Sequence, residues 1–169
     1  MSKFTNDLLN GPADGAKMKE FLIGIVDDFN MLKNPHRRPD VTNVDATAAA
    51  TNAATCYALA NSLKAKYNAH VALTSSHFVA DATNTITSND ANSVATLLTL
   101  GNEIKADFNA HLANTGHVAT DDVNTIVAAD IAGADDAAKT AAAVILLNEA
   151  KAKYNAHLAY AWGALKTSK

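Results

Sequence analysis

The sequence predicts an all-α protein: an elongated helical bundle of about four long helices, built from tandem repeats of about 41 residues with long structured connectors. Three observations favour this fold class. Apolar residues recur at helical spacing in four segments, and no segment alternates clearly with a period of two. The same short motifs return at a nearly constant interval. Each predicted helix is long, roughly 30–45 Å at about 1.5 Å per residue, which is typical of an elongated bundle.

The first repeated motif closes three of the predicted helices and consists of an aromatic residue followed by Asn-Ala-His. Its copies are Tyr67–His70, Phe108–His111 and Tyr154–His157. A second Asn precedes the Asn of each copy on nearly the same helical stripe, at Asn61, Asn102 and Asn148. Phe29 and Asn30 mark a degraded first unit, in which Leu32 occupies the position of the His. Such tandem repetition points to architecture before it points to chemistry.

The second repeated motif lies in the connectors and consists of a His, an Asp and an Asn at constant offsets. Its copies are His36 with Asp40 and Asn43, His77 with Asp81 and Asn84, and His117 with Asp121 and Asn124. The last unit carries a short insertion, which we place within residues 128–133. Long connectors in a compact domain usually have a role, and here the repeated side chains predict a self-structured link between helices.

The first elements in chain order are an N-terminal arm and a helix. Residues 1–12 are predicted as the arm, because Asn10-Gly11-Pro12 is a turn signal, and residues 13–169 as one helical-repeat domain. The first helix is predicted over residues 13–32 and ends before Pro35. Phe4, Leu8 and Leu9 give the arm apolar anchors for a partner surface or for its own bundle.

Three further helices are predicted over residues 45–73, 89–113 and 134–165. Their inward residues are predicted to be Cys56, Leu59, Leu63, Tyr67 and His70; Leu97, Leu100, Ile104, Phe108 and His111; and Ala143, Leu146, Ala150, Tyr154 and His157. Residues 87–90 have the spacing of a capping box for the third helix, with Asp in the place of Glu.

Composition limits the possible functions. A chain of 169 residues with 49% apolar and 18% charged residues can bury a core, and a net charge of −3 offers no basic surface for nucleic acid. Cys56, the single cysteine, excludes an intramolecular disulfide and a cysteine-based zinc site, and we expect it to be buried. The longest apolar stretch, residues 21–26, is too short to cross a bilayer, and no signal segment is recognised at the N-terminus. We therefore expect synthesis in a cytoplasm, without a membrane partner.

The recurrent Asn residues have two interpretations. Their amides could pair across the bundle and set its register, as a buried Asn does in coiled coils. They could instead be a polar flank inherited by duplication. Asn is a mediocre helix former, so its recurrence calls for a reason.

The histidines raise the question of a metal site. His70, His111 and His157 could converge in one layer, and three His ligands suit zinc. Two arguments oppose this: Leu32 stands at the same position in the first unit, and antiparallel helices would place alternate copies at opposite ends. For the connector motif we favour a hydrogen-bonded turn over a metal site, with Asp or Asn capping backbone N–H groups. We therefore assign no catalytic, cofactor-binding or metal-binding residue.

The units resemble repeats in structural proteins of tailed bacteriophages and prophages. The residues that carry the resemblance are 60–70 with 77–86, 102–111 with 117–126, and 148–157. The resemblance implies a non-enzymatic virion role, with other capsid or tail proteins as partners, a homo-oligomeric state and location in the virion. It implies no cofactor and no catalytic activity. The alternative is a metal- or ligand-binding helical bundle that uses the repeated His and Asp residues.

Overall fold

The computed structural model describes residues 42–74, 80–114 and 121–166, with side chains up to residue 159. In these ranges the chain forms three α-helices and no β-strand: α3 (Ala53–Val71), α4 (Val94–Leu112) and α5 (Asp136–Lys166). The all-α prediction is confirmed for this part of the chain. The arm predicted at residues 1–12 and the helix predicted at residues 13–32 lie outside the described residues.

The starts of α3 and α4 are set by polar caps. Asn52 Oδ1 accepts a hydrogen bond from the Thr55 backbone N–H at 3.1 Å, and Thr55 Oγ1 accepts one from the Asn52 N–H at 2.9 Å. Ser93 and Thr96 make the same reciprocal pair at the start of α4. Both helices therefore begin later than the predicted positions near residues 45 and 89. The capping box predicted at residues 87–90 is wrong, because those residues belong to the connector.

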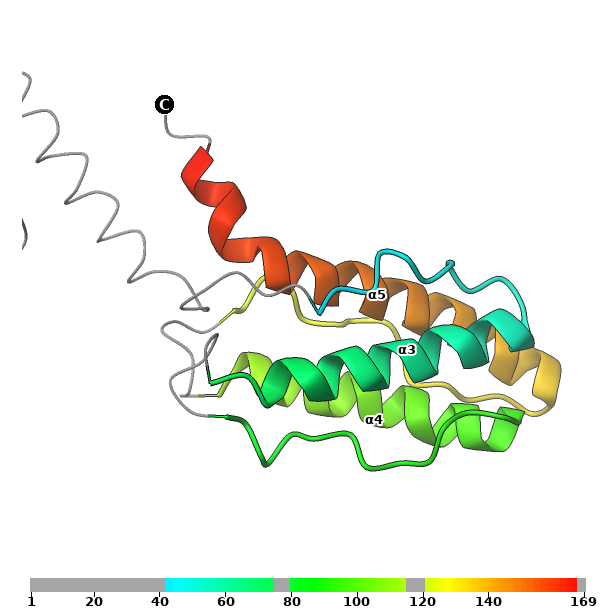
Figure 1. Ribbon diagram of the computed structural model, residues 1–169. Coiled ribbons are helices and arrows are strands. Elements are labelled where there is room, and N and C mark those ends of the chain that lie inside the picture. The colour runs from blue at the N-terminus through cyan, green and yellow to red at the C-terminus, as the bar shows by residue number, and fades with distance from the viewer. Residues whose placement is uncertain (1–41, 75–79, 115–120, 167–169) are drawn as a thin grey trace, which may run out of the picture.

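The three helices run in the same direction. The rings of Tyr67, Phe108 and Tyr154 contact one another at centroid distances of 6.1–6.3 Å, and the histidine three residues later on each helix lies in the next layer. Each connector must therefore return along the bundle before the next helix starts, as Figure 1 shows for the connectors beside α3 and α4. The assumption of antiparallel neighbours is wrong. Long connectors permit a parallel arrangement that short loops would forbid.

The recurrent Asn residues hold the connectors on the helices. Asn68 Oδ1 accepts from the Ile86 N–H at 3.0 Å, and its Nδ2 donates to the Ile86 carbonyl at 2.8 Å. Asn61 makes the same two bonds with Ala91. The equivalent pairs on the other helices are Asn109 with Ile126, Asn102 with Ile131, Asn148 with Ala50, and Asn155 with the Val44 N–H. The amides satisfy backbone groups of extended segments, so the first of the two interpretations, pairing across the bundle, does not hold on the described helices.

Each connector also bonds to a second helix. Glu103 on α4 accepts from the Thr87 and Ser88 N–H groups of the α3–α4 connector, both at 2.8 Å. Glu149 on α5 accepts from Val127 and Ala128 of the α4–α5 connector at 2.9 and 2.7 Å. Burial opposes ionisation of Glu103, but the hydrogen bonds from Ser88 and Thr87 hold its pKa below the usual range. The α3–α4 and α4–α5 connectors are thus hydrogen-bonded to the helix that precedes them and to the helix that follows.

The inward residues predicted from helical spacing are confirmed. All fifteen are buried: Cys56, Leu59, Leu63, Tyr67 and His70 on α3; Leu97, Leu100, Ile104, Phe108 and His111 on α4; and Ala143, Leu146, Ala150, Tyr154 and His157 on α5. The connectors add Val44, Ile86 and Ile126 to this core. Among the helices searched, none combines the length and apolarity that a bilayer span requires.

Candidate functional site

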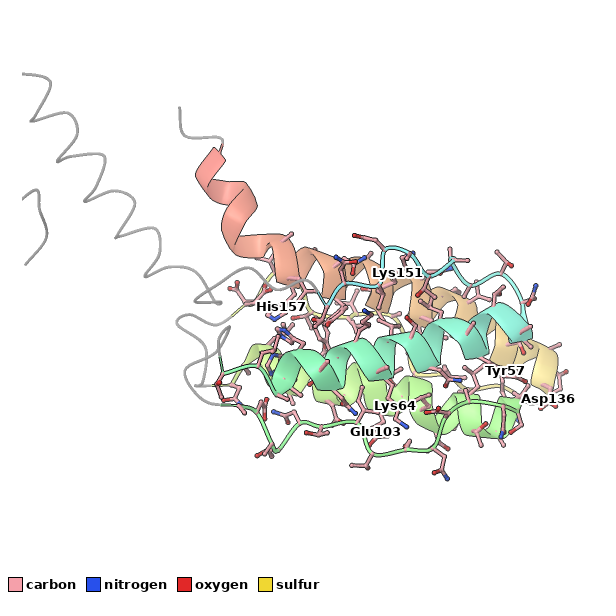
Figure 2. All side chains as sticks on the ribbon, viewed as in Figure 1. Tyr57, Lys64, Glu103, Asp136, Lys151 and His157 are labelled. Carbon is pink, nitrogen blue, oxygen red and sulfur yellow. The ribbon has the colours of Figure 1, made fainter. Side chains whose placement is uncertain are left out.

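Three histidines from three helices meet at the C-terminal end of the bundle. His70, His111 and His157 are each fully buried, and one ring nitrogen of each lies within 4.8 Å of those of the other two. Figure 2 labels His157 at the opposite end of the bundle from Tyr57 and Asp136. The parallel direction of the helices causes this convergence, because each His stands one residue before the end of α3 or α4 and at the matching position of α5.

The three rings are arranged edge to face around the bundle axis. Their centroids are 5.0 Å apart for His70–His111, 5.3 Å for His70–His157 and 5.7 Å for His111–His157, with interplanar angles of 83–89°. The His70 and His111 Nε2 atoms are 3.1 Å apart. An aromatic layer, one turn earlier on the helices, packs against the histidine rings and covers one side of the site; it consists of Tyr67, Phe108 and Tyr154.

A connector carboxylate orients each of two histidine rings. Asp81 Oδ2 lies 2.8 Å from His111 Nδ1, and Asp121 Oδ2 lies 2.8 Å from His157 Nδ1. Both carboxylates are buried with their partners. Since a carboxylate accepts, each Nδ1 carries the proton and directs Nε2 to the axis, an assignment made from the hydrogen-bond network.

The same carboxylates organise the connector turns. Asp81 Oδ1 accepts from the N–H groups of Thr83 and Asn84, both at 3.1 Å, while Oδ2 accepts from Asn84 Nδ2 at 2.7 Å. Asp121 makes the matching bonds with Val123 and Asn124. The predicted hydrogen-bonded turn is confirmed at these two copies. Burial alone would raise the pKa of Asp81, but the bonds from Asn84, His111 and Asn114 hold it well below its usual range.

The tyrosine hydroxyls beneath the histidines link helices to connectors. Tyr67 Oη lies 2.8 Å from the Asn84 carbonyl and 2.9 Å from the Asp107 carbonyl. Tyr154 Oη lies 3.0 Å from the carbonyls of Thr42 and Lys66. Burial, and then the negative charges of Asp81 and Asp107, raise the pKa of Tyr67 far above its usual range, so its hydroxyl is a donor.

The structure pairs two connector Asp residues with histidines on the helices, a pairing that was not predicted from the sequence. Asp81 pairs with His111, 30 residues away, and Asp121 pairs with His157, 36 residues away. Both motifs are visible in the sequence, but which Asp pairs with which His depends on the direction in which the helices run. The connector histidines His36, His77 and His117, with Asp40, lie outside the described residues.

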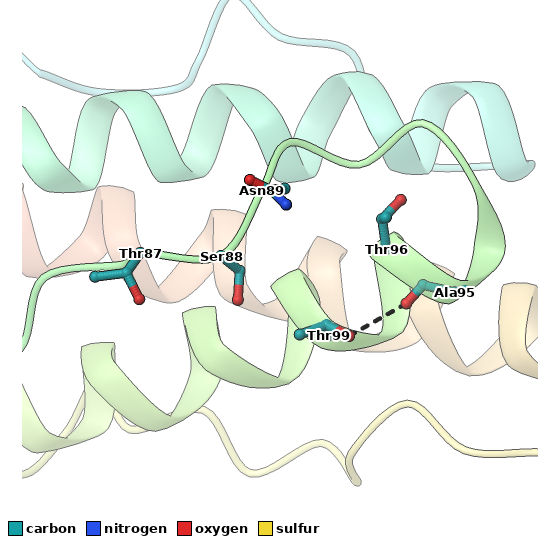
Figure 3. Close-up of a pocket in the computed structure, with 6 residues that line it drawn as sticks. All are labelled: Thr87, Ser88, Asn89, Ala95, Thr96 and Thr99. Carbon is teal, nitrogen blue, oxygen red and sulfur yellow. Dashed lines mark hydrogen bonds between the residues drawn. The ribbon is translucent and has the colours of Figure 1, made fainter.

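Apart from the buried histidine site, the surface has a pocket of about 430 Å³ beside the start of α4, shown in Figure 3. It is lined by Thr87, Ser88, Asn89, Ala95, Thr96 and Thr99. None of these side chains titrates near neutral pH, and Thr99 donates to the Ala95 carbonyl at 3.3 Å. The lining therefore offers no acid, base or activated nucleophile.

The chain was compared with known proteins in three ways. Neither the models of protein families, nor the curated proteins, nor the solved structures contained a match.

Proposed function

We propose that the protein is a non-enzymatic structural component of a tailed-bacteriophage particle, such as a capsid decoration, head-fibre, connector or tail-associated protein, which assembles in several copies. In this proposal the body is a tandem array of about four units, and the degraded first unit occupies the N-terminal residues. The resemblance of the repeats to phage structural proteins supplies the biological setting.

The observation that carries the proposal is the use made of the repeated polar residues. On each of the three described helices, two Asn side chains bind the backbone of an extended connector. Asp81 and Asp121 hold connector turns. These Asn and Asp side chains hold the body together, and the Asn arrangement occurs on three helices while the Asp turn occurs in two connectors. An enzyme usually needs one asymmetric site, whereas a rigid building block does not.

A particle-level experiment tests the proposal. Mass spectrometry of purified particles of the phage that encodes this chain should detect the protein in several copies per particle. Detection in the infected-cell lysate with absence from washed particles would contradict a virion role. A soluble catalytic activity that survives removal of particles would contradict the non-enzymatic assignment.

The N-terminal arm gives a second test on the purified protein. Deletion of residues 2–10 is expected to leave the helical thermal melt nearly unchanged, because all three described helices and their connectors already share a buried core. The same deletion should abolish self-association, measured by light scattering, or attachment to the particle. A truncated protein that unfolds at a much lower temperature would show instead that the arm belongs to the core.

The alternative function, a metal- or ligand-binding bundle, is favoured by one observation, the convergence of three histidines. It is compatible with a structural role, and the elemental composition of the purified protein decides it.

A further inference from the structure

We propose that His70, His111 and His157 bind one divalent transition-metal ion through their Nε2 atoms, and that this ion joins the C-terminal ends of α3 and α4 to α5. The proposed metal site is independent of the proposed virion role, and a negative result for one does not count against the other. Its chemical class is a tris-histidine centre for an ion such as Zn²⁺, for which neutral imidazole is a preferred ligand.

The donor atoms of the histidines have separations that suit a metal ion. A metal–nitrogen distance of about 2.1 Å places two ligands about 3.0 Å apart at a right angle and about 3.4 Å apart at the tetrahedral angle. The His70 and His111 Nε2 atoms are 3.1 Å apart, within this range. Since the three donor nitrogens lie within 4.8 Å of one another, an inward movement of at most about 1.5 Å completes the set.

Two of the histidine rings have a carboxylate on the side opposite to the proposed metal ion. Histidine ligands of metals commonly donate their other N–H to a carboxylate, which fixes the tautomer and increases the basicity of the ligating nitrogen. His111 and His157 have this partner, in Asp81 and Asp121, at 2.8 Å. The two carboxylates also provide negative charge next to the position of a divalent ion, in a region where water does not screen it.

The Nε2 atoms of His70 and His111 are in short contact. Two Nε2 lone pairs at 3.1 Å repel each other, so one nitrogen of the His70–His111 pair must hold a proton or both must face a cation. A metal ion satisfies both nitrogens at once and lies where the third ring can also reach it. Since His111 carries its proton on Nδ1, the shared proton belongs to His70 Nε2, and metal binding requires a neutral His70 to carry it on Nδ1 instead.

The burial of the site indicates a structural role for the ion. All three histidines are 0% exposed, and the aromatic layer closes the site from below. Three protein donors leave one position of a tetrahedral ion to a water molecule. The stabilisation would come from a direct link among the three helices, added to the ring contacts that already join them here.

The test uses the full chain, stripped with a chelator and then titrated with Zn²⁺ alone. We expect about one zinc per chain by elemental analysis. The melting temperature should rise by about 5–10 °C when free zinc is about 100 times its dissociation constant. A protein that retains no zinc and melts at the same temperature with or without it overturns the proposal, and the cluster is then a hydrogen-bonded polar core.

Two variants remove the donor atom while keeping the fold-forming contact. In His111→Asn and His157→Asn, the amide N–H occupies the region of Nδ1 and can still donate to the Asp, whereas Nε2 is absent. Both should lose the bound zinc and the zinc-dependent rise in melting temperature. Retention of a full equivalent of zinc in either variant shows that the ligand set is wrong.

Three control variants separate metal binding from general stability. Tyr67→Phe loses a buried hydroxyl contact next to the site and should melt earlier, yet bind zinc as the wild type does. His77→Asn and His117→Asn, in the connector motif, should lower stability modestly and leave the metal content unchanged. Loss of zinc in either connector variant would contradict the assigned ligand set.

One further variant tests the carboxylate behind the His111 ring. Asp81→Asn should keep the one-to-one stoichiometry but weaken zinc binding about 10- to 100-fold, because Asp81 positions His111 without touching the ion. An unchanged affinity would contradict the orienting role of Asp81. Zinc that binds more tightly to this variant would contradict the charge argument.

Discussion

The apolar middle of the bundle differs from its C-terminal end in what fills the space between the same three helices. In the middle, Leu63, Ile104 and Ala150 meet, one from each helix, and all are buried. At the end, three imidazole rings and two carboxylates take that place. Apolar contacts have little directionality, whereas each buried N–H needs an acceptor at a defined position. The middle therefore supplies most of the burial, and the end determines how the helices are aligned along one another.

The largest expected effect comes from the layer that borders the apolar middle. Tyr67→Ala removes a buried ring that contacts Phe108 and Tyr154 and should lower the free energy of unfolding by about 3–5 kcal/mol. Urea unfolding followed by circular dichroism measures this change. An unchanged unfolding midpoint would show that this aromatic layer is not part of the core.

An intermediate effect is expected at the polar end. Asp121→Ala leaves the buried Nδ1–H of His157 and two backbone N–H groups without their acceptor. The expected cost is about 1–3 kcal/mol, the usual penalty for a buried donor that loses its partner. Asp121→Asn retains one acceptor oxygen and should cost less in the same unfolding experiment. Equal losses for both variants would mean that charge, not hydrogen bonding, is the important property.

The smallest effect is expected where the two regions meet. Tyr67 and Tyr154 each bond to a carbonyl of the next helix, at Asp107 and Lys66, whereas α4 carries Phe108 at this position. Phe108→Tyr should add the missing bond to the Lys153 carbonyl and stabilise the protein by at most about 1 kcal/mol. Thermal melts of the variant and the parent decide it, and a lower melting temperature would show that the three aromatic positions are not equivalent.

The apolar middle could be predicted from the sequence because it depends on local periodicity alone. The spacing of residues such as Leu97, Leu100 and Ile104 requires only 3.6 residues per turn, so the buried face follows without knowledge of the neighbours. The start of α4 was predicted too early, since Thr87 and Asp90 have the spacing of a cap and Ser93 with Thr96 competes for the same role. The sequence rules for helix capping identify both candidate start positions but do not decide between them.

The histidine end could be predicted only in part, since it depends on the direction of the helices. The residues His70, His111 and His157 were recognised as one set, and the assumption of antiparallel neighbours then separated them. The Asn amides explain why the helices are parallel: by binding an extended connector along the helix surface, as Asn61 and Asn68 do, they return the chain to its starting end. The recurrence of Asn is visible in the sequence, but it does not show that the amide binds extended backbone rather than another helix.

The attachment of residues 42–50 to α5 has a consequence for how the chain folds. The Asn68–Ile86 contact joins residues 18 positions apart, whereas the Asn155–Val44 contact joins residues 111 positions apart. During synthesis the α3–α4 interface can form early, but the segment before α3 has to wait until the last helix has left the ribosome. Contacts of such high contact order are slow to form. The docking of residues 42–50 on α5 should therefore be the final, rate-limiting step of folding.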